Sequence, residues 1–295
     1  MTASARPVGW RVWVHAARTR TLPAALAPVL VGTAVAARAG EVVPWRAGAA
    51  LLVALALQVA VNYANDAFDG ERGIDTPDRV GPTRAVAAGW VSARSMKVAT
   101  AAALAVAVLA GLALAAVTTW WLVAIGGAAV LATLGYSGGP APYASAGLGE
   151  VFVFVFFGLV ATVGSAFVHL EAVPAPAVVG AVPIGLLAVA ILVTNNLRDL
   201  PTDARAGKRT LAVRLGETGT RRLLVALVLG ALLGALAHPA LWPPLALLAA
   251  PFALPVLRPI WRGATGWSLL PVLAATGRLQ LALALGMGAA LFLGS

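Results

Sequence analysis

Long runs of hydrophobic residues, separated by short polar segments, repeat along almost the whole chain of 295 residues. A helix needs about 20 consecutive apolar residues to cross a bilayer. Nine runs come near this length and predict nine membrane-spanning helices, at 20–38, 46–66, 97–117, 119–136, 150–170, 175–197, 221–238, 240–260 and 274–293. In the first of these, Pro23 and Pro28 are expected to distort the helix. The pattern predicts an all-α, polytopic membrane protein.

The composition supports this prediction. Charged residues make up 11% of the chain and hydrophobic residues 60%, whereas a soluble domain has about 25% charged residues. Because no linker divides the chain, we expect a single integral membrane domain over residues 1–295. The chain has no cysteine, which excludes disulfides, cysteine-ligated zinc and a cysteine nucleophile.

The net charge of +10 would suit nucleic-acid binding, but its distribution indicates membrane topology instead. With nine spans, all of the 21 basic residues except Arg38 and Arg46 fall on alternate connections. The positive-inside rule then places the N-terminus and these connections in the cytoplasm and the C-terminus outside. The N-terminal segment, in which arginines alternate with Trp10 and Trp13, lacks a cleavable signal pattern. It is expected to lie on the inner membrane surface.

The few acidic residues gather at the cytoplasmic ends of two spans. The chain has 11 acids, and most of them form two clusters: Asp66, Asp69, Glu71, Asp75 and Asp78, then Asp199 and Asp203. An ionised Asp at the centre of a membrane helix costs about 2.5–3.5 kcal/mol. Acids that abut uncharged spans therefore indicate a functional site. For Glu71, Asp75, Asp78 and Glu217, ordinary loop charges are an equally good interpretation.

The two clusters have a similar pattern. Asn62, Asp66 and Asp69 share one face of a helix. Asn195, Asp199 and Asp203 share another, unless Pro201 bends or ends that helix. The similarity suggests two halves of an old duplication that meet around a central cavity.

These two faces offer hard oxygen ligands without a closed cage. Mg²⁺ prefers such ligands and commonly takes one or two carboxylates together with substrate phosphates. Basic segments suited to phosphate follow each cluster, at 81–84 (Gly-Pro-Thr-Arg) and 207–210 (Gly-Lys-Arg-Thr). The pattern therefore predicts a divalent metal that holds a diphosphate, with capping loops on the cytoplasmic side.

Four segments make the chain similar to a known family. They are 19–23 (Thr-Arg-Thr-Leu-Pro), 62–69 with 75–84, 136–140 with 148–150, and 195–203 with 207–210. Through them the chain resembles the UbiA-type intramembrane prenyltransferases, and within these the branch that acts on 1,4-dihydroxy-2-naphthoate in menaquinone synthesis. The resemblance covers residues 18–216. One departure is Gly73, where the superfamily often has an aspartate, and Asp75 is the candidate substitute.

The resemblance implies transfer of a polyprenyl group from polyprenyl diphosphate to 1,4-dihydroxy-2-naphthoate. CO₂ and diphosphate are lost and demethylmenaquinone is formed, with Mg²⁺ or a similar divalent cation. It implies catalytic and metal-binding roles for Asp66, Asp69, Asp199 and Asp203, with Asn62 as a further metal ligand. The candidate diphosphate-binding residues are Arg72, Arg79, Arg84, Lys208 and Arg209. The candidate acceptor-binding residues are Arg20, Tyr136, Glu150, Asn195 and Arg198. The prenyl tail is expected in an apolar tunnel open to lipid.

Simpler interpretations remain open for some of these residues. Glu150 fits a solvated acid at a helix start equally well, and Tyr136 and Tyr143 fit interfacial aromatics. The phenylalanines of segment 152–157 are expected to face lipid or to line the tunnel. The three histidines, at positions 15, 169 and 238, lack metal-ligand spacing.

Three other functions were weighed. A sibling enzyme would use 4-hydroxybenzoate, homogentisate or protohaem as its acceptor. A phosphatidyl-alcohol transferase is excluded, because Asp69-Gly70 is followed by Glu71-Arg72-Gly73 rather than by that enzyme class's Asp-Gly-x-x-Ala-Arg signature. A cation transporter would need acids deep within its spans, whereas these acids lie at span ends.

Overall fold

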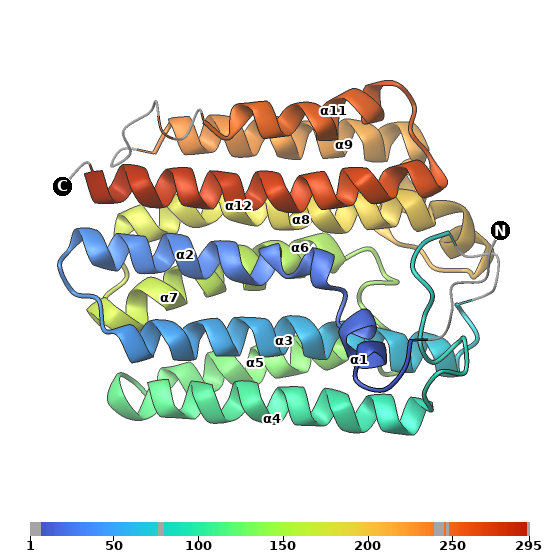
Figure 1. Ribbon diagram of the computed structural model, residues 1–295, viewed down its shortest axis with the longest axis horizontal. Helices are drawn as coiled ribbons and strands as arrows, with labels where there is room; N and C mark the ends of the chain where they lie inside the picture. The colour runs from blue at the N-terminus through green and yellow to red at the C-terminus, as the bar shows by residue number, and fades with distance from the viewer. Residues whose placement is uncertain (1–6, 76–79, 239–244, 246–247, 294–295) are drawn as a thin grey trace.

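The computed structural model describes residues 7–75, 80–238, 245 and 248–293. This part of the chain is helical, and the long helices run side by side in one bundle (Figure 1). In chain order the elements are α1 (Arg11–Ala16), η1 (Thr19–Thr21), α2 (Pro23–Arg38), α3 (Pro44–Glu71), α4 (Ala93–Val117), α5 (Trp121–Gly135), α6 (Gly149–Val153), η2 (Phe154–Val160), α7 (Ala161–Leu170), α8 (Ala175–Arg205), α9 (Leu211–Leu236), η3 (Ala250–Ala253), α11 (Leu254–Trp261), η4 (Gly266–Ser268) and α12 (Leu269–Leu293).

Six of these helices are long and apolar enough to cross a membrane: α3, α4, the continuous α6–η2–α7, α8, α9 and η4–α12. The bent pair α1–η1 and α2 makes a seventh if it is counted as one span, and α5 is a shorter apolar helix. The helices cover the predicted spans except 240–260, part of which lies outside the described residues. The predicted all-α, multi-pass membrane fold is confirmed.

The prolines act at only one of the expected positions. Pro23 is the first residue of α2, where its fixed φ suits a helix start, and the helix axis turns by 58° at this break. Pro28 lies inside α2 without ending it. Pro201 does not end α8, which continues to Arg205. Asp199 and Asp203 therefore lie on one continuous helix.

Helices α2 and α8 form the centre of the bundle. α2 packs against α3, α7, α8 and α12, and α8 also packs against α9 and η2. On the other side, α3 packs against α4 and α5. The largest buried cluster joins apolar side chains of α2, α8, α9 and α12. The space between α3, α5, η2 and α8 is where the cavity described below lies.

The polar connections gather at one end of the bundle. The α3–α4, α5–α6 and α8–α9 connections lie there together with α1, while α12 ends at the opposite end (Figure 1). Exposed tryptophans occur near both ends: Trp45, Trp120 and Trp121 at one, Trp10, Trp261 and Trp267 at the other. Such aromatic belts mark the two membrane–water interfaces.

The N-terminal helix α1 is anchored to the bundle. Val12 and Ala16 are buried against Tyr63 and Met96, and the Tyr63 hydroxyl donates a hydrogen bond to the Trp13 carbonyl at 3.0 Å. The opposite face of α1 is exposed. The amphipathic segment expected from the sequence is thus a short cap over the end of α3.

A close helix contact gives a stability prediction. A Cβ added at Gly32 of α2 would lie 2.3 Å from the carbonyl oxygen of Thr162 on α7. At Gly48 of α3, a Cβ would meet nothing within 4 Å. We expect Gly32→Ala to destabilise the protein by about 1–3 kcal/mol, as overpacking does, and Gly48→Ala to leave it unchanged. Thermal unfolding of both variants in detergent measures this, and equal melting temperatures would contradict the contact.

Candidate active site

A cavity of about 1630 Å³ opens between the helices. Its polar end is lined by the two acidic motifs: Asn62, Asp66, Asp69, Asn195, Asp199 and Asp203. Arg18, Arg20, Arg84 and Lys208 line the same region. The remainder is mostly apolar and follows α4, α5, η2 and α7. The cavity therefore combines a charged head with a long hydrophobic body.

Asp66 is held by backbone donors from the α3–α4 connection. Its Oδ2 accepts a hydrogen bond from the amide of Ala85 and its Oδ1 one from Val86, both at 3.0 Å. The Asp66 side chain is 1% exposed. An ionised carboxylate has about four lone-pair sites, so two bonds leave acceptor capacity toward the cavity. Asp66 both anchors this loop and offers oxygen ligands.

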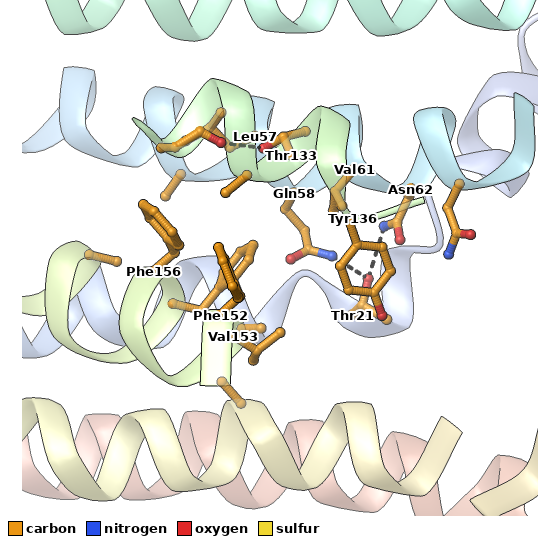
Figure 2. Close-up of a pocket in the computed structure, with 18 of the residues that line it drawn as sticks. Thr21, Leu57, Gln58, Val61, Asn62, Thr133, Tyr136, Phe152, Val153 and Phe156 are labelled. Atoms are coloured by element: carbon orange, nitrogen blue, oxygen red, sulfur yellow. Dashed lines mark hydrogen bonds between the residues drawn. The ribbon is translucent and has the colours of Figure 1, made fainter. Parts of the chain in front are cut away.

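Asn62 is tied to the N-terminal segment. Its Nδ2 donates to the carbonyl of Ala17 at 2.9 Å and to Oγ1 of Thr21 at 3.1 Å (Figure 2). The same threonine oxygen accepts from Nε2 of Gln58 at 3.0 Å. The amide nitrogen of Asn62 thus holds η1 against α3. Only its oxygen remains as a possible metal ligand.

The α8 motif presents its groups to the same space. Nε and Nη2 of Arg198 grip the two carboxylate oxygens of Asp199, at 2.8 and 2.7 Å. Asn195 donates to the carbonyl of Ile191 within the helix. The neighbouring Asn196 donates from Nδ2 to Oε1 of Glu150 at 3.0 Å. Helix α8 therefore carries an Arg–Asp pair and an amide pair side by side.

Lys208 joins the two motifs. Its Nζ lies 2.9 Å from Oδ2 of Asp69 on α3 and 3.9 Å from Oδ1 of Asp203 on α8. The carboxylates on the two helices are thus close enough for one cation to contact both. Among the residues that the structure describes, no three His, Asp or Glu side chains by themselves form a metal-binding group. This donor set fits an open site, in which a divalent cation needs oxygens from a substrate to complete its coordination.

The predicted diphosphate-binding residues divide into two groups. Arg84 lines the cavity beside Asp75, 3.4 Å from it, as does Lys208. Arg72 instead donates to the backbone carbonyls of Ser137 and Gly139 in the α5–α6 connection. It is not among the cavity-lining residues, and neither is the exposed Arg209.

Some sequence-based candidates lie outside the described residues, and others pair on the surface. Arg79 and Asp78 fall in the segment 76–79, which the structure does not describe. Glu71 pairs with Lys97 at 2.7 Å, with both side chains well exposed. Glu217 pairs with Arg221 within α9. Glu71 and Glu217 are thus loop or surface charges.

Of the predicted acceptor-binding residues, Arg20, Tyr136, Asn195 and Arg198 line the cavity. Glu150 does not; it lies behind Asn196 and is 7% exposed. The interpretation of Glu150 as a solvated acid is therefore wrong, because α6 begins inside the bundle rather than in water. Burial raises the pKa of the Tyr136 phenol, and the nearby Glu150 carboxylate raises it further. Tyr136 consequently stays neutral at physiological pH.

Aromatic rings form a row along the cavity wall. Tyr136 meets Tyr143 edge to face at 5.5 Å between ring centroids, and Tyr143 stacks on Phe152 at 4.0 Å. Phe156 follows at 6.1 Å from Phe152. Helix η2, which contains Phe156, is a π-helix, a form often found at functional sites. Phe152, Phe156 and Phe157 line the cavity, so they form the expected tunnel wall.

Sequence reasoning missed three polar residues at this site. Arg18 ends α1 with a φ of 52°, a left-handed conformation that is uncommon for a residue other than glycine. This turn directs the chain into η1 and places Thr21 against α3. Gln58 lies one turn before Asn62 on the same face, and this spacing was the available signal.

Comparison with known proteins agrees with this geometry. The model of the UbiA prenyltransferase family matches residues 25–268. A 1,4-dihydroxy-2-naphthoate octaprenyltransferase of Mycobacterium tuberculosis is 46% identical over 96% of this chain and 97% of its own length. The Escherichia coli protein of the same description is 37% identical over 90% of each chain.

Solved structures support the fold. A UbiA homologue from Aeropyrum pernix aligns with a TM-score of 0.68 at 17% identity, over 94% of this chain and 98% of its own. A homologue from Archaeoglobus fulgidus, bound to DMAPP and Mg²⁺, aligns with a TM-score of 0.63 at 18% identity, over 95% and 98%. With the family match covering most of the chain and close relatives aligned along nearly its full length, the chain belongs to the UbiA prenyltransferase family.

Proposed function

We propose that this protein transfers a polyprenyl group from polyprenyl diphosphate to 1,4-dihydroxy-2-naphthoate, with loss of CO₂, in menaquinone biosynthesis. The observation that carries the proposal is the near full-length similarity to enzymes of that description in bacteria. The cavity suits such substrates, because a charged end is joined to a long apolar body. We assign the activity to one membrane domain that includes both motifs.

The substrates have natural places in this cavity. The diphosphate would lie at the polar end, where Lys208 and Arg84 can offset its charge. The prenyl tail would follow the apolar wall of α4, α5 and η2. The acceptor would lie between these regions, near Tyr136, with its carboxylate toward Arg198 or Arg20.

The metal would be held by Asp66, Asp69, Asp199 and Asp203, with the side-chain oxygen of Asn62 as a further ligand. A bound divalent cation supplies positive charge to a leaving diphosphate. The donor set fits this role because the carboxylates come from two facing helices and Lys208 already contacts two of them. Mg²⁺ is the natural choice for hard oxygen ligands.

The reaction balances without a further reactant. The bond between the prenyl carbon and the diphosphate oxygen breaks, and the allylic carbon bonds to the ring carbon that bears the carboxylate. The carboxylate leaves as CO₂, so the ring regains aromaticity without loss of a C–H proton. Lys208 and Arg84 offset charge on the leaving group. The apolar walls keep water from the cationic carbon, and the pair Asn196–Glu150 holds the acceptor side of α8 in place.

We place the protein in the cell membrane, with the polar end of the bundle in the cytoplasm and the C-terminus outside. Nearly all basic residues lie on connections at that end, as the positive-inside rule requires. Both water-soluble groups, the diphosphate and the naphthoate, would then reach the site from the cytoplasm, while the prenyl tail remains in the bilayer.

The acceptor is tested with purified protein in lipid vesicles supplied with octaprenyl diphosphate. 1,4-Dihydroxy-2-naphthoate, 4-hydroxybenzoate and homogentisate are offered separately, and product is identified by mass. We expect product from the naphthoate at a far higher rate than from the other two acids. Preference for 4-hydroxybenzoate or homogentisate would keep prenyl transfer and overturn the acceptor.

Removal of the metal gives a separate prediction. Excess chelator should abolish prenyl transfer, and Mg²⁺ should restore it, because no described cluster of three acids binds a metal tightly by itself. Metal affinity should rise when a prenyl diphosphate is present, since the substrate completes the coordination. Binding of Mn²⁺ with and without geranyl thiodiphosphate, followed by electron paramagnetic resonance, measures this. Full activity in chelator would refute the metal assignment.

A further inference from the structure

A buried polar side chain outside the two acidic motifs faces the cavity. Gln58 lies on α3 one helical turn before Asn62 and two turns before Asp66, so the three share one face. Its side chain is 6% exposed and lines the cavity, between the apolar Leu57 and Val61. A buried amide is costly unless its polar atoms find partners. Its position therefore requires an explanation.

The orientation of the Gln58 amide is fixed by Thr21. The Thr21 hydroxyl donates to the carbonyl of Arg18 at 2.9 Å, so its proton is used and its oxygen is left to accept. It accepts from Nδ2 of Asn62 and from Nε2 of Gln58. Because Thr21 takes the nitrogen of Gln58, Oε1 must point away from Thr21.

Oε1 of Gln58 faces open space in the cavity. It accepts no printed-range hydrogen bond from the described residues and is not an enclosed atom. In the view of Figure 2, the amide lies between the rings of Tyr136 and Phe152, with the oxygen on the Phe152 side. Flat aromatic side chains with one fixed hydrogen-bond acceptor suit a flat aromatic ligand that carries a hydroxyl.

We propose that Gln58 is a specificity-determining residue, whose Oε1 accepts a hydrogen bond from the 4-hydroxyl of the naphthoate, and that Thr21 is the residue that positions it. This inference rests on the proposed function. The 1-hydroxyl of the acceptor lies beside the ring carboxylate and donates to it internally. The 4-hydroxyl has no such internal partner, so a protein acceptor can select it and fix the ring in the cavity.

The test compares 1,4-dihydroxy-2-naphthoate with 1-hydroxy-2-naphthoate, which lacks only the 4-hydroxyl. For wild-type protein, we expect the inhibition constant of the analogue to exceed the KM of the substrate by about 10-fold or more, the effect of one lost hydrogen bond to a buried group. In Gln58→Met, the KM of the substrate should rise by about 10-fold. The inhibition constant of the analogue and the KM of octaprenyl diphosphate should stay unchanged.

Thr21 supplies a second pair of variants. Thr21→Val should reduce the preference for the 4-hydroxyl as Gln58→Met does, and Thr21→Ser, which keeps the hydroxyl, should restore it. Wild-type protein that binds both acids equally would overturn the inference without any variant. So would a Gln58→Met protein with an unchanged preference. Wild-type protein that makes no naphthoate product would instead refute the proposed function.

Discussion

Replacing Asp66 or Asp199 with asparagine is expected to abolish prenyl transfer while the protein still folds into membranes. Each change removes a negative charge from the polar end of the cavity. Metal-assisted charge stabilisation contributes several kcal/mol, so kcat/KM should fall by about 10³-fold or more. Initial rates with saturating Mg²⁺ measure the loss. Normal turnover in either variant would remove that residue from the metal site.

Folding and surface controls make this result interpretable. An asparagine at position 66 has one carboxyl-like oxygen for the amides of Ala85 and Val86, so Asp66→Asn should also lower stability by about 1 kcal/mol. Thermal unfolding separates this modest effect from the loss of activity. Glu71→Gln is the matched control, because Glu71 pairs with Lys97 on the surface and exposed pairs contribute little. Its activity should equal that of the wild type.

Lys208→Met is expected to have the second-largest effect and to separate two adjacent cations. Lys208 contacts acids of both motifs and lines the cavity, whereas Arg209 is exposed and does not. We expect kcat/KM to fall by about 10²-fold in Lys208→Met, as when one charge-stabilising group is removed. Arg209→Met should stay close to wild type. The comparison is made on kcat/KM for octaprenyl diphosphate.

The charge-conserving variant completes this comparison. Lys208→Arg should keep more activity than Lys208→Met, because guanidinium also binds phosphate oxygens. If Arg209→Met proved as damaging as Lys208→Met, the assignment of the diphosphate to the cavity beside Asp69 and Asp203 would be wrong.

Much of this architecture follows from the sequence because membrane helices obey strong constraints. Apolar runs must be helical in lipid, so the spans were predictable to within a few residues. The helical period placed Asn62, Asp66 and Asp69 on one face, and they do line one cavity. Helix continuation through Pro201 was not predictable, since the local effect of proline depends on tertiary packing.

The individual roles of polar side chains were harder to infer. Composition and spacing cannot show that the guanidinium of Arg72 holds the α5–α6 connection, because that contact joins residues far apart in the chain. The same applies to Glu150, which α6 carries into the protein interior. Gln58 was overlooked since a single amide within an apolar run has no motif of its own. Its significance appears only with Thr21, which comes from another helix.

The most direct test of the central claim uses 1,4-dihydroxy-2-naphthoate labelled with ¹³C at the carboxyl carbon. Purified protein in vesicles is given this acid, octaprenyl diphosphate and Mg²⁺, and both ¹³CO₂ and the prenylated product are measured by mass. The account predicts one labelled CO₂ for each prenylated product and no label in the product. A prenylated product that retains the label, or no product from folded protein, would contradict it.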